Sequence, residues 1–177
     1  MRPWKVIGRR DLLSLPGRVE VAMETVELPD GRRIDDYVQL HVTNFVLVFA
    51  ETADRRVVCL RQYRHAVRGP SLELVAGRID AGEDPLAAAQ RELLEESGYQ
   101  SAQWEELGTY VVSPTQGIGR GYAFHARNAT RVREPNSGDL EEALVELLAR
   151  DALIAAMRKG EIASASHLAA LALALLR

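Results

Sequence analysis

Residues 91–99 read RELLEESGY and place three glutamates and an arginine within about two helical turns. Like charges three or four residues apart destabilise a helix by roughly a few tenths of a kcal/mol. A helix that keeps Glu92, Glu95 and Glu96 together therefore needs something that compensates their repulsion. Two explanations are open, because either water solvates an acidic face or a cation binds there.

The segment before this stretch carries the signals of a helix start. Asp84 is suited to cap a helix, Pro85 to occupy its first position, and Gly98 to end it. In such a helix Glu92 and Glu96 share one side, while leucine and alanine residues form an apolar stripe on another. The pattern predicts one amphipathic helix over about residues 85–97.

The acidic side of this helix suits a hard divalent cation, since Mg²⁺ and Mn²⁺ prefer carboxylate, carbonyl and water oxygens. Such an ion also serves hydrolysis at phosphorus, because it polarises a phosphoryl oxygen and neutralises charge on a leaving phosphate. A solvated acidic face would explain a lone pair of glutamates. It does not explain Gly77, Glu83 and Arg91 at their spacing.

The complete pattern resembles the signature of the Nudix hydrolases. It consists of Gly77, then Glu83 after five residues, then Arg91 after seven more, followed by Glu-apolar-x-Glu-Glu-x-Gly. A chance match of seven such residues is on the order of one in a billion per starting position. The one departure is Tyr99, which is aromatic where the family usually has an aliphatic packing residue.

The resemblance implies a role for each residue of the signature. Arg91 would hold one of the carboxylates by a bidentate pair, and Gly77 would let the loop backbone approach the ion. The implied cofactor is Mg²⁺, with Mn²⁺ as an alternative. The implied metal ligands are Glu92, Glu96, Glu95, the carbonyl oxygen of Ala76 and, near the cluster, Glu83.

The flanking segments indicate a subgroup. The stretch RQYRHAVRGPSLELVAG (61–77) resembles the segment before the helix in ADP-ribose pyrophosphatases and related nucleotide-sugar hydrolases. By this resemblance Arg64 would meet a substrate phosphate and Glu73 would bind metal or the terminal sugar; both could instead be surface salt-bridge partners. Pro114, sixteen residues beyond Gly98, stands where a proline is associated with ADP-ribose hydrolases.

The implied reaction is metal-dependent hydrolysis of the diphosphate bond of ADP-ribose or a related nucleoside diphosphate sugar, which gives a nucleoside monophosphate and a sugar phosphate. The loop after Pro114 departs from the subgroup, since TQGIGRG (115–121) has no acidic residue. Thr115, Gln116 and Arg120 would then contact a different terminal group or a phosphate. Hydrolysis of GDP-mannose or a dinucleotide polyphosphate therefore stays open, as does a non-catalytic nucleotide-binding module.

The C-terminal third also resembles this subgroup. Asp139 and Glu141 fall where the subgroup carries its late acidic residues, one a general base and one a metal ligand, with Glu142 as an alternative. The implied catalytic residues are thus Glu95, Arg91, Asp139 and Glu141. The implied substrate-binding residues are Arg64, Glu73, Pro114, Gln116 and Arg120.

Hydrophobic periodicity predicts the other elements. Residues 19–27 and 34–42 alternate apolar and polar around the turn sequence PDG, which indicates an antiparallel hairpin. Residues 45–50 are continuously apolar and predict a central strand. Further strands are expected at 55–64, 71–77, 108–112 and 121–129, residues 141–148 fit strand or helix, and helix is expected from 150 onward with a break near Gly160.

This order of strands and helices predicts an α/β protein with a mixed sheet covered on both faces. The resemblance makes it an α/β/α sandwich of the Nudix type. It also divides the chain into an N-terminal β region (1–43) and a Nudix hydrolase domain (44–177). Relatives pair their subunits through the N-terminal region, so the resemblance implies a homodimer.

Charge and composition exclude several other classes. The net charge of −3 offers no general attraction for nucleic acid. The single cysteine, Cys59, excludes an intramolecular disulfide and a cysteine zinc cluster, and its apolar surroundings predict a buried side chain. No apolar run is long enough to span a membrane, so a cytoplasmic location is expected. The four histidines are scattered and are expected to be structural or exposed.

Overall fold

The structure, a computed structural model, describes residues 1–136, 138 and 143–176. The chain forms two units, one of Met1–Asn44 with Tyr110–Arg120 and one of Phe45–Thr109 with Gly121–Arg177. The assignment of residues 1–43 to dimerisation and 44–177 to catalysis stays a prediction. No helix in the described residues is long and apolar enough to cross a membrane.

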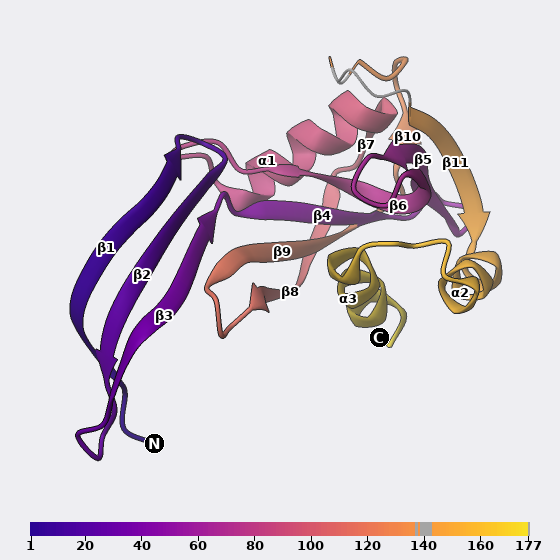
Figure 1. Cartoon of the computed structure of the whole chain (residues 1–177). Coiled ribbons are helices and arrows are strands. Elements are labelled where there is room, and N and C mark those ends of the chain that lie inside the picture. The colour runs from indigo at the N-terminus through magenta and orange to yellow at the C-terminus, as the bar shows by residue number, and fades with distance from the viewer. Residues whose placement is uncertain (137, 139–142, 177) are drawn as a thin grey trace. The chain divides into compact units, whose positions relative to one another are not determined.

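The first unit contains a three-stranded antiparallel sheet in the order β1-β2-β3 (Figure 1). Its strands are β1 (Lys5–Leu15), β2 (Val19–Glu27) and β3 (Arg33–Val42). The predicted hairpin of β2 and β3 is confirmed. Strand β1 was not predicted; its pairing with β2 shifts register between Val6 and Gly8 and again between Asp11 and Leu13. Such irregularities interrupt the alternation on which a sequence prediction depends.

The second sheet has six strands in the order β11-β5-β6-β4-β9-β8. Strand β4 pairs parallel with β9 and antiparallel with β6, so the predicted mixed sheet is confirmed. The ambiguous segment near residue 145 is a strand, since β11 pairs along β5. The bounds are β4 Phe45–Ala50, β5 Arg56–Arg64, β6 Gly69–Arg78, β8 Gln103–Ser113, β9 Ile118–Arg127 and β11 Ala143–Ala149, and a separate short pair is β7 Tyr99–Gln100 with β10 Thr130–Arg131.

Helices cover both sides of the second sheet. Helix α1 (Pro85–Glu92) and helix α3 (Ala165–Leu175) lie on opposite sides of β4, and α2 (Arg150–Lys159) follows β11 (Figure 1). This is the layered α/β arrangement that the element order predicted. The core under α1 joins Ala88, Ala89 and Leu93 to side chains of the sheet, and these are Val46, Val48, Val58, Leu60, Val75 and Phe124.

Cys59 on β5 is fully buried, and burial raises the pKa of its thiol to about 12. The thiol is therefore protonated at neutral pH and behaves as a small apolar group, as predicted.

Candidate active site

The helix that carries the acidic residues begins as predicted and changes its geometry near the end. The Asp84 carboxylate accepts hydrogen bonds from the backbone N–H groups of Leu86 and Ala87, and Pro85 follows it. After Glu92 the chain makes a π-helical turn, η1 (Leu93–Ser97). Turns of this kind are rare and are frequently found at functional sites. The sequence predicted a helix here but not this wider turn.

Gly98 ends the π-helical turn with φ of 75°, the left-handed conformation in which glycine is favoured. The Ser97 hydroxyl donates to the carbonyl of Leu93 at 2.5 Å, and the N–H of Gly98 donates to the carbonyl of Leu94 at 3.0 Å. A Cβ at Gly98 would also overlap the backbone of Arg133. Glycine is thus required here by conformation and by space.

Two of the predicted metal ligands converge on the end of β6. The carboxylate of Glu92 occupies the space that a Cβ on Gly77 would fill. An oxygen of Glu96 accepts a hydrogen bond from the backbone N–H of Ala76 at 3.0 Å. Strand β6 and the helical segment therefore bring both carboxylates to the Ala76–Gly77 backbone, and the lack of a side chain at Gly77 makes room for one of them.

Arg91 connects the acidic residues to one another. Its Nε and Nη2 atoms each donate to Glu83 at 2.9 Å, which forms a bidentate pair. Its Nη1 atom donates to Glu92 at 2.7 Å and to Glu95 at 3.2 Å, while Nη2 also donates to the carbonyl of Arg78 at 3.0 Å. Arg91 thus ties the loop before α1 to the acidic side of the helix.

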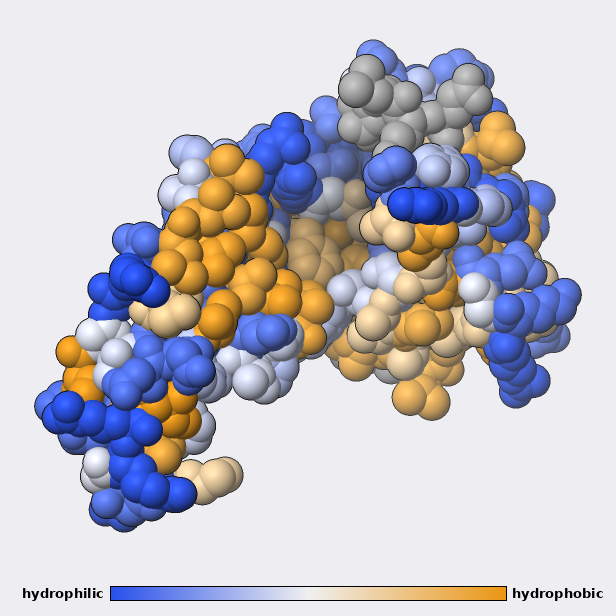
Figure 2. Space-filling view, in the orientation of Figure 1, coloured by the Kyte–Doolittle hydropathy of each residue, from blue (hydrophilic) through white to orange (hydrophobic). Residues whose placement is uncertain are grey.

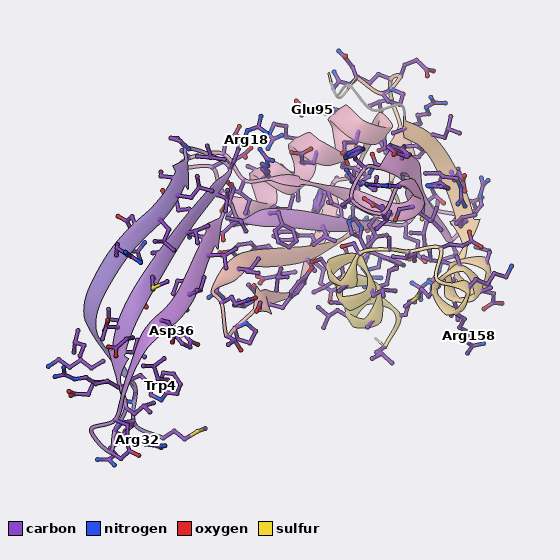
Figure 3. The ribbon with its side chains drawn as sticks, in the orientation of Figure 1. Trp4, Arg18, Arg32, Asp36, Glu95 and Arg158 are labelled. Carbon is purple, nitrogen blue, oxygen red and sulfur yellow. The ribbon has the colours of Figure 1, made fainter. Side chains whose placement is uncertain are left out.

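Ionisation in the cluster follows from these contacts. The hydrogen bonds from Arg91, helped by the backbone N–H of Asp80, lower the pKa of Glu83 to about 2. The carboxylates of Glu83, Glu92 and Glu95 raise the pKa of Arg91 above its usual value. Glu83 is therefore charged at neutral pH, and both of its carboxylate oxygens accept hydrogen bonds. Glu95 projects from the outer side of the helical segment, where 38% of its side chain is exposed (Figure 3).

The donors at the end of β6 fit a hard divalent cation in their chemistry. All are oxygens, and the space beside Gly77 already accommodates a carboxylate. Across the residues that the structure describes, however, no three acidic, histidine or cysteine side chains form a ready-made metal site. Glu92 and Glu95 instead share Arg91 Nη1, so closing the site around an ion requires these side chains to turn toward it.

Arg64 and Glu73 form a pair, but Glu73 is not a surface partner. Only 3% of the Glu73 side chain is exposed, and it accepts from Nε and Nη2 of Arg64 at 2.9 and 2.5 Å. Gln62 donates to the same carboxylate at 3.0 Å. The imidazole of His167 lies 3.5 Å away. Sequence reasoning did not connect His167 to this pair, because it lies 94 positions along the chain from Glu73 and no motif links them.

The predicted residues of the segment directly after β8 are in the other unit of the chain. Pro114, Gln116 and Arg120 belong to the first unit, where the carbonyl of Gln116 accepts from the N–H of Leu40 at 2.7 Å. The N–H of Arg120 donates to Asn44 at 3.1 Å. Their role toward substrate stays a prediction.

Asp139, Glu141 and the alternative Glu142 lie outside the described residues. The segment that precedes them is tied to the acidic turn, since the N–H of Asn136 donates to the carbonyl of Glu95 at 2.7 Å. The N–H of Val132 likewise donates to the carbonyl of Gly98 at 2.9 Å. The described chain up to Asn136 therefore runs beside the candidate metal ligands.

The acidic turn, the glycine beneath it and the mixed sheet agree with one family. The NUDIX domain family matches residues 40–169, which is most of the chain. The chain belongs to the Nudix family. The predicted Nudix hydrolase assignment and its α/β fold are thereby confirmed, and hydrolases of this family generally require a divalent metal ion.

Relatives of this Nudix protein include two curated bacterial proteins. The ADP-ribose pyrophosphatase of Bacillus subtilis (strain 168) is 28% identical over 152 residues, which cover 84% of this chain and 80% of that protein. The methanol dehydrogenase activator of Bacillus methanolicus is 36% identical over 111 residues, or 62% of this chain and 58% of that protein. The chain thus matches less than two thirds of the activator's length.

A solved structure described as an ADP compounds hydrolase has the same fold as this Nudix protein. The TM-score is 0.85, the match covers 98% of this chain and 93% of the other, and the identity is 19%. At this identity the similarity shows the fold alone.

Proposed function

We propose that this Nudix protein hydrolyses the diphosphate bond of ADP-ribose or a related nucleoside diphosphate sugar and uses Mg²⁺ as its metal, with Mn²⁺ as an alternative. The products are a nucleoside monophosphate and a sugar phosphate. The observation that carries the proposal is the convergence of Glu92 and Glu96 on the Ala76–Gly77 backbone. A relative named ADP-ribose pyrophosphatase that matches over most of both chains supports the substrate.

Each group of the site has a chemical task in this reaction. The metal ion, when bound, supplies Lewis-acid activation and neutralises charge on the phosphates. Glu96, the carbonyl of Ala76 and, after turning toward the ion, Glu92 and Glu95 would hold it. Arg91 orients the carboxylates of Glu92 and Glu95, and its pair with Glu83 fixes the guanidinium in place. We assign the proton acceptor to Asp139 or Glu141.

Substrate positioning falls to residues outside the acidic helix. Arg64 presents a charge to a phosphate. Pro114, Gln116 and Arg120 contact the terminal group of the substrate or a phosphate. Residues 115–121 contain no acidic residue, so GDP-mannose and dinucleotide polyphosphates are kept as alternative substrates. The proposed location is the cytoplasm.

The purified chain, incubated with Mg²⁺ and a panel of ADP-ribose, GDP-mannose and a dinucleotide polyphosphate, is expected to release AMP from ADP-ribose fastest. Chromatography of the nucleotides measures the products, and samples with chelator provide the control. Faster release from one of the other two compounds would transfer the substrate assignment to that compound. If no compound is cleaved in the presence of metal, the non-catalytic alternative is favoured.

We also propose that the protein is a homodimer that pairs through the N-terminal sheet. The register aligns Leu13 with Val21 and Leu15 with Val19 on one face of that sheet. The two leucines are 46% and 47% exposed. Apolar residues also gather over this sheet in the space-filling view (Figure 2). An exposed apolar face of this kind is typical of a protein interface.

Leu13→Glu is expected to convert the dimer to a monomer, because it places a charge in the proposed apolar contact and weakens association by at least about tenfold. Sedimentation velocity measures the mass in solution. Ser14→Glu is the matched control, since Ser14 is the next residue of β1 and points to the opposite face. A wild-type chain that sediments as a monomer over the whole concentration range would contradict the proposal.

A further inference from the structure

On the β4 side, strand β6 loses its partner halfway along and the C-terminal segment takes that place, while β5 stays paired on the other side. The pairing of β4 with β6 runs from Phe45 with Arg78 to Val48 with Val75. Toward the start of β6, the N–H of Leu72 donates to the carbonyl of Glu161 at 2.8 Å, and the N–H of Leu74 donates to Nδ1 of His167 at 3.0 Å. His167 thus completes the hydrogen bonding of a buried strand edge.

This hydrogen bond determines the tautomer of His167. Because Nδ1 accepts from Leu74, the neutral ring carries its proton on Nε2. Burial lowers the pKa of His167 to about 4, so the ring is neutral at pH 7. The Nε2 atom lies 3.5 Å from an oxygen of Glu73. His167 therefore directs an N–H toward the buried carboxylate.

Glu73 connects His167 to Arg64, because its carboxylate contacts both side chains. Burial alone would raise the pKa of Glu73, but the hydrogen bonds and charge of Arg64, together with the other polar neighbours, hold it below its usual value. The carboxylate is therefore charged, with bonds from two nitrogens of Arg64 and from Gln62. A buried ion pair contributes little net stability compared with apolar packing. The Arg64–Glu73 pair instead serves to orient Arg64, because the two-point contact fixes the plane of the guanidinium.

Arg64 has one side in this network and another at a cavity. Its side chain is 40% exposed, and it lines a cavity of about 270 Å³ whose other lining residues are Ala66, Val67, Glu73, Ala163, Ser164 and His167. Among these lining residues Arg64 carries the positive charge, so an anionic group that enters the cavity meets its guanidinium.

We propose that His167 is a positioning residue that, through Glu73, holds the Arg64 guanidinium in the orientation that binds a phosphoryl group at this cavity. The inference rests on the proposed function, in which Arg64 contacts a substrate phosphate, and adds the residues that hold it. Gln62 and Glu73 complete the network on the strand side.

Two substitutions separate the positioning role of His167 from its structural role. In His167→Asn the amide oxygen takes the place of Nδ1 and still accepts from Leu74, but the side chain is too short to reach Glu73. In His167→Gln the amide reaches Glu73 but leaves the N–H of Leu74 without its acceptor. We expect the asparagine variant to raise KM for ADP-ribose about tenfold with kcat within about twofold, at near wild-type stability. The glutamine variant loses stability but keeps KM within about twofold.

A double-mutant cycle with Arg64→Ala tests whether His167 acts through Arg64. Arg64→Ala alone is expected to raise KM about tenfold or more, and adding His167→Asn to it should change KM no further. His125→Asn is the matched control, because His125 is similarly buried but lies outside the network beside Phe49 and Glu51. It should leave KM unchanged in both backgrounds.

The outcomes separate the positioning inference from the proposed function. If KM follows thermal stability across the variants, or if His167→Asn raises KM equally with and without Arg64, the positioning role is wrong. Calorimetric binding of inorganic pyrophosphate to the same variants gives a readout independent of turnover. A wild-type chain that does not hydrolyse ADP-ribose overturns the proposed function. In that case the network is still supported if His167→Asn weakens pyrophosphate binding only when Arg64 is present. If His167→Asn and the wild type bind pyrophosphate equally well, the network is overturned.

Discussion

Glu96→Gln is expected to lower kcat for ADP-ribose about a thousand-fold while leaving the fold intact. The substitution keeps the size of the side chain and an oxygen for the N–H of Ala76, but removes the charge of a proposed metal ligand. Loss of about 4 kcal/mol of transition-state stabilisation corresponds to this change, since each 1.4 kcal/mol or so is tenfold. Steady-state release of AMP, measured across a range of Mg²⁺ concentrations, determines it.

Glu106→Gln is the matched control for this result, because Glu106 is an exposed acidic residue of β8 whose carboxylate accepts a hydrogen bond from the Thr109 hydroxyl. It should retain kcat within about twofold. The free energy of unfolding of Glu96→Gln is expected to stay within about 0.5 kcal/mol of wild type, since one like-charge repulsion is relieved as one hydrogen bond weakens. Equal activity of Glu96→Gln and wild type would remove Glu96 from the metal site.

Gly77→Ala is expected to lower kcat by about a hundred-fold with little change in stability. The added Cβ would overlap the carboxylate of Glu92, which is the flexible end of a long side chain and can move aside. The fold therefore tolerates the methyl group, but Glu92 leaves the position at which it faces the backbone of Ala76 and Gly77. Displacement of a ligand or of its support commonly costs about 10–100-fold in metal affinity or activity.

Gly69→Ala tests whether this effect belongs to the site, because Gly69 begins the same strand, β6. Among the described residues, a Cβ at Gly69 would have only the carbonyl oxygen of Val67 near it, at 3.8 Å. Chemical denaturation and the Mg²⁺ dependence of kcat are compared for the two variants. If both lose activity equally, or if Gly77→Ala unfolds, the explanation through Glu92 is incorrect.

Most of the regular elements were predictable because their signals are local. Strands β2 and β3 alternate around a turn sequence, and α1 has a cap, a proline and a terminal glycine. Strand β1 could not be predicted in the same way, since its two register shifts exchange the faces of successive residues. The segment that became β11 fits either helix or strand by itself, and only its pairing with β5 decides between them.

The π-helical turn of Leu93–Ser97 also required the structure. Its residues have the same helix propensity in an α-helical or a π-helical turn, so composition cannot distinguish the two. The turn nevertheless sets the directions of Glu95 and Glu96 with respect to Arg91 and Ala76. Its presence at the acidic cluster agrees with the usual location of such turns.

The sequence by itself determined the family and the candidate metal site, because Gly77, Glu83 and the acidic residues lie within 20 positions and their spacing carries the chemistry. Only the tertiary structure decided how Arg64 is held. Glu73, Gln62 and His167 come from two strands and the last helix, and their meeting depends on the point where β4 leaves β6 and the C-terminal segment takes its place. A linear pattern cannot report a contact whose partners are joined only by the packing of distant elements.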